Sequence, residues 1–157
     1  MIKTINGNIF NSNANFIVCE MNCQGIIDDN MIVISEEFPH VEKEYMKYIR
    51  YCKKNHVEIL GSVQYVPTEI WALNMVDTMK NNNIIDYDTN YQYIVNMFCK
   101  NMSDEGIKRN SNAVKESMSK IFNNAEMIGA TVAVPYSIGN FVHDIANKYH
   151  VDVEIWR

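Results

Sequence analysis

The fold of this chain is decided by one stretch, residues Phe16 to Gly25, with the sequence FIVCEMNCQG. The apolar run at its start predicts a buried strand, and Gly25 at its end permits a sharp turn. Ligands of open α/β sheets bind beyond the carboxyl ends of the strands, so we expect Asn22 and the backbone of residues 23–25 to hold a small molecule. An ordinary surface loop after a strand is the alternative, and this stretch alone leaves both interpretations open.

Length and charge limit the kind of protein. A chain of 157 residues fits one domain, residues 1–157, that folds without disulfides or metals. Its 14 basic and 19 acidic residues give a net charge of -5, and the basic residues are scattered, so we expect no nucleic-acid partner. No apolar run approaches the roughly 20 residues that cross a bilayer, and the N-terminal residues lack the apolar core of a signal peptide. We therefore expect a cytoplasmic protein with no membrane partner, and the oligomeric state stays open.

The cysteines and histidines do not indicate a metal site. The four cysteines contain no Cys-x-x-Cys pair, and the four histidines are scattered along the chain. Reduced thiols in an intracellular chain are usually buried small hydrophobes, so we expect neither a metal nor a cofactor. These residues are Cys19, Cys23, Cys52, Cys99, His40, His56, His143 and His150.

Hydrophobic periodicity predicts strands that alternate with helices, and this alternation indicates an α/β sandwich. Gly129 marks a helix C-terminus, and Pro135 marks a strand end. The predicted strands are a short one before Gly7, then Phe16–Met21, Gly61–Pro67, Ile70–Val76, Thr131–Pro135 and Val151–Trp156. The predicted helices are one capped by Asp29 or Asn30, then Val41–Lys54, Ala113–Met127 and Phe141–Tyr149.

The middle of the chain has a weaker pattern. Four apolar residues between Thr89 and Cys99 fall on one helical face, which predicts a helix over that range. A polar turn at Asp86–Asp88 precedes this helix, and the polar stretch Asn101–Asn112 predicts a solvated linker after it. The four apolar residues are Tyr93, Ile94, Met97 and Phe98.

Read together, several short motifs resemble those of a macro domain, an α/β fold that binds ADP-ribose. Asn22-Cys23-Gln24-Gly25 is similar to the Asn-Cys-Gln-Gly of the branch that processes ADP-ribose 1''-phosphate or ADP-ribosylated targets. The resemblance covers nearly the whole chain, and it implies a three-layer α/β/α sandwich with a central mixed sheet. The other matching motifs are Gly7-Asn8-Ile9, Phe38-Pro39 with Tyr45, Leu60-Gly61-Ser62-Val63, Ala72-Leu73-Asn74-Met75, Thr89-Asn90-Tyr91, Val134-Pro135-Tyr136-Ser137-Ile138-Gly139 and Val153-Glu154-Ile155-Trp156.

The phosphate-binding loops depart from the family pattern. Family members follow Asn-Cys-Gln-Gly with a Gly-x-Gly segment, where this chain has Asp28 and Asn30. A carboxylate facing a diphosphate costs about 1 kcal/mol even when solvated. The second glycine-rich loop is shortened, because Gly139-Asn140 runs directly into the last helix. Asn8 replaces the family's aspartate, so it accepts a hydrogen bond from an adenine amino group without charge assistance. The resemblance therefore implies degenerate phosphate-binding loops.

The resemblance also implies site residues. Asn22 is implied to hydrogen-bond the distal ribose and, in hydrolytic members, to orient the attacking water. An amide is no general base at neutral pH, so Asp28 and His143 are the candidate acid or base groups beside it. The implied ligand-binding residues are Asn8, Ile9, Asn22, Cys23, Gly25, Ile26, Pro135, Ser137, Ile138, Gly139, Asn140 and Phe141.

Three functions remain open at this point. The first is a hydrolase that acts at the distal ribose of ADP-ribose 1''-phosphate or of an ADP-ribosylated target. The second is a non-catalytic receptor or sponge for ADP-ribose or a related NAD-derived nucleotide. The third is a degenerate macro domain kept as an interaction module. We favour nucleotide binding and leave catalysis open, because binding needs only a pocket while hydrolysis also needs a placed water.

Overall fold

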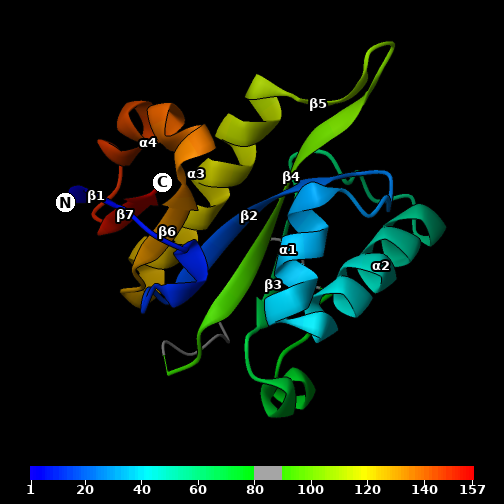
Figure 1. The fold of residues 1–157 in the computed structure, drawn as a ribbon, viewed down its shortest axis with the longest axis horizontal. Coiled ribbons are helices and arrows are strands. Elements are labelled where there is room, and N and C mark those ends of the chain that lie inside the picture. The colour runs from blue at the N-terminus through cyan, green and yellow to red at the C-terminus, as the bar shows by residue number, and fades with distance from the viewer. Residues whose placement is uncertain (80–89) are drawn as a thin grey trace.

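The computed structural model describes residues 1–79 and 90–157. In this part of the chain, seven strands form one mixed sheet in the order β1-β7-β6-β2-β4-β3, with β5 paired to β4 (Figure 1). The strands are β1 (Ile2–Ile5), β2 (Phe16–Asn22), β3 (Val63–Pro67), β4 (Tyr93–Ser103), β5 (Gly106–Arg109), β6 (Val132–Pro135) and β7 (Val153–Trp156). The α-helices are α1 (Asp29–Glu37), α2 (Pro39–Lys54), α3 (Ser111–Ile128) and α4 (Gly139–Ala146), and the short 3-10 helices are η1 (Ile9–Asn11), η2 (Ile70–Met75) and η3 (Tyr136–Ile138).

Strand β2 lies at the centre of the sheet, and all seven of its residues are buried, as the apolar sequence predicted. It pairs in parallel with β4 from Phe16 to Asn22, but with β6 only at Phe16 and Ile17. Strands β1, β7, β6, β2 and β4 are all parallel, whereas β3 and β5 run antiparallel to β4. The parallel strands therefore end at one edge of the sheet, and β2 and β6 separate as they approach it.

Helices cover both faces of the sheet (Figure 1). Side chains of β2 alternate between two cores, because successive residues of a strand point to opposite faces. Ile17, Cys19 and Met21 pack with α1 and α2, whereas Phe16 and Val18 pack with α3 and α4. The predicted three-layer α/β/α sandwich with a central mixed sheet is confirmed.

The helix predicted over Thr89–Cys99 is wrong in the described part of that range, where Tyr93–Ser103 forms β4. Residues 93–99 are all buried, because β4 lies between β2 and β3 and both of its faces are covered. A strand buried on both faces shows no alternation of apolar and polar residues, so its apolar run also matched a helical period. Its polar residue, Asn96, is tolerated because its Nδ2 donates to Gln64 Oε1 at 3.0 Å.

The linker predicted over Asn101–Asn112 is also wrong. Strand β4 continues to Ser103, turns, and pairs with β5 as a hairpin that extends past the rest of the sheet (Figure 1). The polar sequence of this hairpin reflects exposure on both sides and gave no strand signal. Helix α3 then begins at Ser111, capped by the side chain of Asn110, and ends at Gly129, whose φ of 71° is the left-handed conformation that glycine adopts most easily.

Two smaller predictions need correction, and one is untested. Residues 70–75 form the 3-10 helix η2 and not a strand. The N-cap of α1 is Asp28, whose side chain accepts from the Met31 N–H, and not Asp29 or Asn30. The turn predicted at Asp86–Asp88 lies outside the described residues.

Among the described helices, none combines the length and the apolar character that crossing a lipid bilayer requires.

Candidate functional site

A cleft opens where β2 and β6 separate at the carboxyl edge of the sheet. Strand order changes direction at this point, and ligands of open α/β sheets bind at such switch points. The cleft is partly open to solvent and has a volume of about 170 Å³. Its walls come from η1, β2, α1, β6 and η3, and its lining residues are Ile9, Phe10, Val18, Cys19, Glu20, Asn30, Val33, Ile34, Pro135 and Ser137.

The cleft has an apolar side and a polar side. Apolar side chains reach it from η1, from α1 and from the end of β6. Val33 is 50% exposed on α1 and Ile9 is half-buried on η1, so both offer surface to a ligand. The polar side holds Glu20 and Ser137, and also Asn30, whose Nδ2 donates to the Glu20 carbonyl oxygen at 3.3 Å. Such a cleft fits a flat ring joined to a polar group.

Glu20 is a buried carboxylate that is fully paired inside the cleft. Arg109 of β5 donates to it twice, from Nε to Oε1 at 2.6 Å and from a terminal nitrogen to Oε2 at 3.0 Å. Ser137 donates to Oε2 at 2.7 Å. A two-point contact with a guanidinium is the strongest partner that a carboxylate finds in a protein. The hydrogen bonds of Glu20 with Arg109 and Ser137 therefore link three elements that are distant in sequence: β2, β5 and η3.

Burial by itself would raise the pKa of Glu20. The hydrogen bonds from Arg109 and Ser137, together with the positive charges of Arg109 and Lys100, outweigh burial and lower the pKa below its usual value near 4.5. Glu20 is therefore a stable carboxylate at neutral pH, and it is not a proton donor for a reaction in the cleft.

This lowered pKa predicts a loss of stability in acid. A carboxylate with a lower pKa in the folded state stabilises the fold above its unfolded pKa, and that stability is lost as the pH falls. We expect the free energy of unfolding to decrease from about pH 4.5 downward, and to decrease less steeply in Glu20→Gln. Urea denaturation at several pH values measures both slopes. Equal slopes in the two proteins would show that Glu20 contributes nothing to the acid sensitivity.

The Cys19 thiol lines the cleft but is not a nucleophile. Burial, and to a smaller extent the neighbouring Glu20 charge, raise its pKa to about 12. The pKa of Cys23 is raised to about 12 by burial and by Cys52. The thiolate is the reactive form of cysteine, so both thiols are inert at neutral pH.

Asn22, at the end of β2, is 1% exposed and is held by a local network. Its Oδ1 accepts from the Gln24 N–H at 3.0 Å, the Ile26 N–H at 3.3 Å and the Tyr45 hydroxyl at 2.7 Å. Its Nδ2 donates to the Ile26 carbonyl at 2.9 Å and to Asp28 Oδ2 at 3.1 Å. The amide thus uses both its donor and acceptor groups to shape the turn after β2. It does not line the cleft.

The structure brings only part of the predicted site together. Asn22, Gly25, Ile26 and Asp28 lie in the turn after β2, and the buried Cys23 donates its N–H to the Lys100 carbonyl. Asn8 caps η1 at the edge of the sheet, where its Oδ1 accepts from the Phe10 N–H at 2.9 Å. The members that line the cleft itself are Ile9, Pro135 and Ser137.

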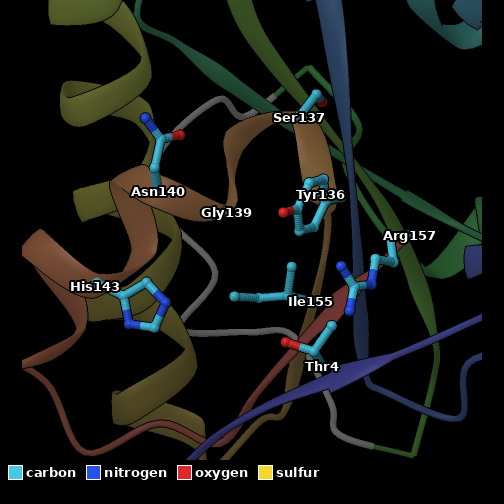
Figure 2. A pocket seen from close by; sticks show the side chains of 8 residues that line it. All are labelled: Thr4, Tyr136, Ser137, Gly139, Asn140, His143, Ile155 and Arg157. Carbon is cyan, nitrogen blue, oxygen red and sulfur yellow. The ribbon is translucent and has the colours of Figure 1, made fainter.

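The segment after β6 divides the remaining predicted residues. Ile138 is fully buried, and Phe141 is half-buried against the core beneath α3 and α4. Gly139, Asn140 and His143 line a second pocket beside α4, with Ser137 at its margin (Figure 2). His143 lies on α4, which packs with α3 on one face of the sheet, and it lines this second pocket and not the cleft.

Sequence reasoning missed Glu20 and Arg109. A signal for Glu20 was present, since a lone carboxylate inside an apolar strand must find a partner when it is buried. Arg109 gave no signal, because it lay in a stretch that was predicted to be a solvated linker. In the ranges 1–79 and 90–157, no three His, Cys, Asp or Glu side chains gather in a way that could hold a metal ion.

Comparison with known proteins gave matches to solved structures alone. No protein-family model matches the chain, and no curated protein matches its sequence. A macrodomain protein from Streptomyces coelicolor has a TM-score of 0.73 at 16% identity, over 100% of this chain and 99% of that chain. The macrodomain of Thermus aquaticus DarG has a TM-score of 0.69 at 13% identity, over 100% and 98% of the two chains. Thermosipho africanus DarTG, solved in complex with ADP-ribose, has a TM-score of 0.68 at 15% identity, over 99% of this chain and 41% of that chain.

Proposed function

We propose that this chain, whose fold is that of a macrodomain, binds a ribose-bearing nucleotide of the ADP-ribose type in the cleft between β2 and β6. The observation that carries the proposal is the position of the cleft, at the point where two parallel strands separate and apolar and polar groups face each other. The similarity of the chain's fold to that of a protein solved in complex with ADP-ribose supports the choice of ligand.

The apolar side of the cleft suits the adenine ring. Ile9, Val33 and Pro135 offer apolar surface to a flat ring. Asn8 does not itself line the cleft but immediately precedes Ile9, and its Oδ1, which accepts from the Phe10 N–H, has a second lone pair available to an adenine amino group. The cleft volume of about 170 Å³ is below the roughly 300–1,000 Å³ of pockets that enclose a whole ligand, so the rest of the nucleotide would lie along the open edge.

The proposal is confined to binding. Asn22 has no free polar atom with which to orient a water, because neighbouring groups already use its oxygen and its nitrogen. Asp28 accepts from Asn22 and from the Met31 N–H. His143 lies in a different pocket. Release of phosphate from ADP-ribose 1''-phosphate by the wild-type protein would contradict this restriction.

Isothermal titration with ADP-ribose tests the site. We expect Val33→Glu to weaken binding at least about tenfold, since the new carboxylate removes apolar contact and repels the diphosphate. Ile32→Glu is the matched control: Ile32 is 48% exposed on the same helix and does not line the cleft. It should bind ADP-ribose like the wild type.

Three outcomes would contradict the proposal. Unchanged affinity in Val33→Glu would place the ligand elsewhere, and an equal loss in both variants would point to a general effect of negative charge on α1. No heat from the wild type at millimolar ADP-ribose would leave the interaction-module alternative standing. Both side chains are half exposed, so we expect both variants to fold. Thermal melts check that unfolding is not the cause of any loss of binding.

A further inference from the structure

A second pocket, here called the α4 pocket, lies between α4 and the strands β1 and β7. It is open to solvent on one side and measures about 590 Å³, which is within the volume range of small-molecule sites. Ile155 forms its floor, and polar side chains surround that floor (Figure 2). These polar residues are Thr4, Tyr136, Ser137, Asn140, His143 and Arg157.

The α4 pocket is separate from the cleft between β2 and β6. The lining residues of the two pockets differ except for Ser137: the α4 pocket is bounded by β1, β7 and α4, whereas the cleft is bounded by η1, β2, α1 and the end of β6. Ser137 lies at the margin of both pockets, but its hydroxyl donates to Glu20 on the cleft side. One ligand in the cleft would therefore leave the α4 pocket unfilled.

The charge of the α4 pocket is opposite to that of the chain. The chain carries a net charge of -5, yet no aspartate or glutamate is among the described residues that line this pocket. Arg157 and His143 stand on opposite sides of the Ile155 floor (Figure 2). A concave surface that holds a guanidinium and an imidazole without a carboxylate favours an anion.

Arg157 is positioned to meet a ligand. Its Nε donates to Asn6 Oδ1 at 3.1 Å, and its guanidinium carbon lies 5.3 Å from the centre of the Tyr136 ring. These two contacts fix the plane of the guanidinium. Its terminal nitrogens face the pocket above Ile155 and Thr4 and have no hydrogen-bond partner within the described chain (Figure 2). A planar fork of free N–H groups matches the oxygens of a phosphate.

We infer that the α4 pocket binds the phosphate group of a small phosphorylated molecule, with a sugar phosphate as the class that fits best. Arg157 holds two phosphate oxygens, and His143 donates to the phosphate from the other side of the floor. The Thr4 and Tyr136 hydroxyls and the Asn140 amide are the groups available to sugar hydroxyls. This site is independent of nucleotide binding in the cleft.

Isothermal titration with ribose 5-phosphate tests the inference on the full chain. We expect the wild type to bind, and both Arg157→Gln and His143→Gln to bind at least about tenfold more weakly. Ribose should not bind, because it lacks the phosphate. Ribonate, which carries a carboxylate, should bind more weakly than ribose 5-phosphate, because it lacks the phosphate oxygens that match the guanidinium fork. Arg50→Gln is the matched control, since Arg50 is an exposed arginine on α2, on the opposite face of the sheet, and it should bind like the wild type.

The results separate this site from the cleft. The Val33→Glu variant should bind ribose 5-phosphate with the affinity of the wild type, although its affinity for ADP-ribose is reduced. Conversely, the absence of ADP-ribose binding to the wild type would contradict only the proposed function. The inference is overturned if ribose 5-phosphate gives no heat at millimolar concentration, if Arg157→Gln binds it normally, or if ribonate binds equally well. Thermal melts show whether the variants are folded, and loss of binding in a folded His143→Gln protein would support the site on its own.

Discussion

We expect Arg109→Met to lower the free energy of unfolding by about 3 kcal/mol, because it leaves the buried Glu20 carboxylate without its main partner. Glu20 is only 4% exposed, and Arg109 supplies two of its three closest hydrogen bonds. The Arg109 side chain is 35% exposed, so water enters more easily here than in a fully buried pair. For that reason the expected loss is at the lower end of the range for such pairs. Urea denaturation at neutral pH measures it.

A second variant shows that the effect comes from the unpaired charge. Glu20→Gln/Arg109→Met removes the charge as well as its partner, so it should be more stable than Arg109→Met by at least about 1 kcal/mol. Lys108→Met is the control on the same strand: its ion pair with Glu105 is exposed and should change stability by less than about 1 kcal/mol. A double variant no more stable than Arg109→Met would show that Arg109 acts through packing and not through charge.

We expect Asn22→Ala to lower the free energy of unfolding by about 2–3 kcal/mol, since it removes several buried hydrogen bonds at once. The Tyr45 hydroxyl keeps a bond to the Asn22 carbonyl at 3.0 Å, which limits the loss. The N–H groups of Gln24 and Ile26 lose their acceptor. For a chain of this size, the loss corresponds to a melting temperature lower by about 5–10 °C, which a thermal scan measures.

The size of this effect separates a structural asparagine from a catalytic one. A residue that only orients a water can be removed without loss of stability, whereas Asn22 closes the turn after β2. Asn101→Ala is the control, because Asn101 is exposed and its side chain accepts from Gln24 and from its own neighbour. It should change stability by less than about 0.5 kcal/mol. Full stability of Asn22→Ala would show that the network around Asn22 does not hold the turn.

Together, the two networks define what the carboxyl edge of the sheet presents to a ligand. The Glu20–Arg109 pair fixes the polar side of the cleft, and the Asn22 network fixes the turn beside it. Asp28, which stands where glycine was expected, caps α1 and contacts Asn22. Asn30, the other position where the resemblance implied glycine, donates to the Glu20 carbonyl, so both side chains have structural roles here.

The sequence by itself determined the elements whose signals are local. Strand β2 was predicted from a nearly continuous apolar run, α2 from residues that repeat three and four apart, and the end of α3 from Gly129. Each of these signals depends on neighbours within a few residues, so no knowledge of the rest of the chain was needed. The alternation of strands and helices also indicated an α/β sandwich, because such elements pack as layers, and the resemblance of the ordered motifs to a macro domain implied three layers.

Only the tertiary structure decided the nature of β4 and the composition of the cleft. Strand β4 looks helical in sequence because it is buried on both faces, and that burial is set by β2 and β3. The pairing of Glu20 with Arg109 joins residues 89 positions apart, through a hairpin whose polar sequence carries no strand signal. The predicted site after β6 was divided between two pockets, because Pro135 ends β6 at the cleft whereas Gly139, Asn140 and His143 belong to α4 and line the α4 pocket. Local sequence specifies local conformation, whereas which side chains meet depends on packing between distant segments.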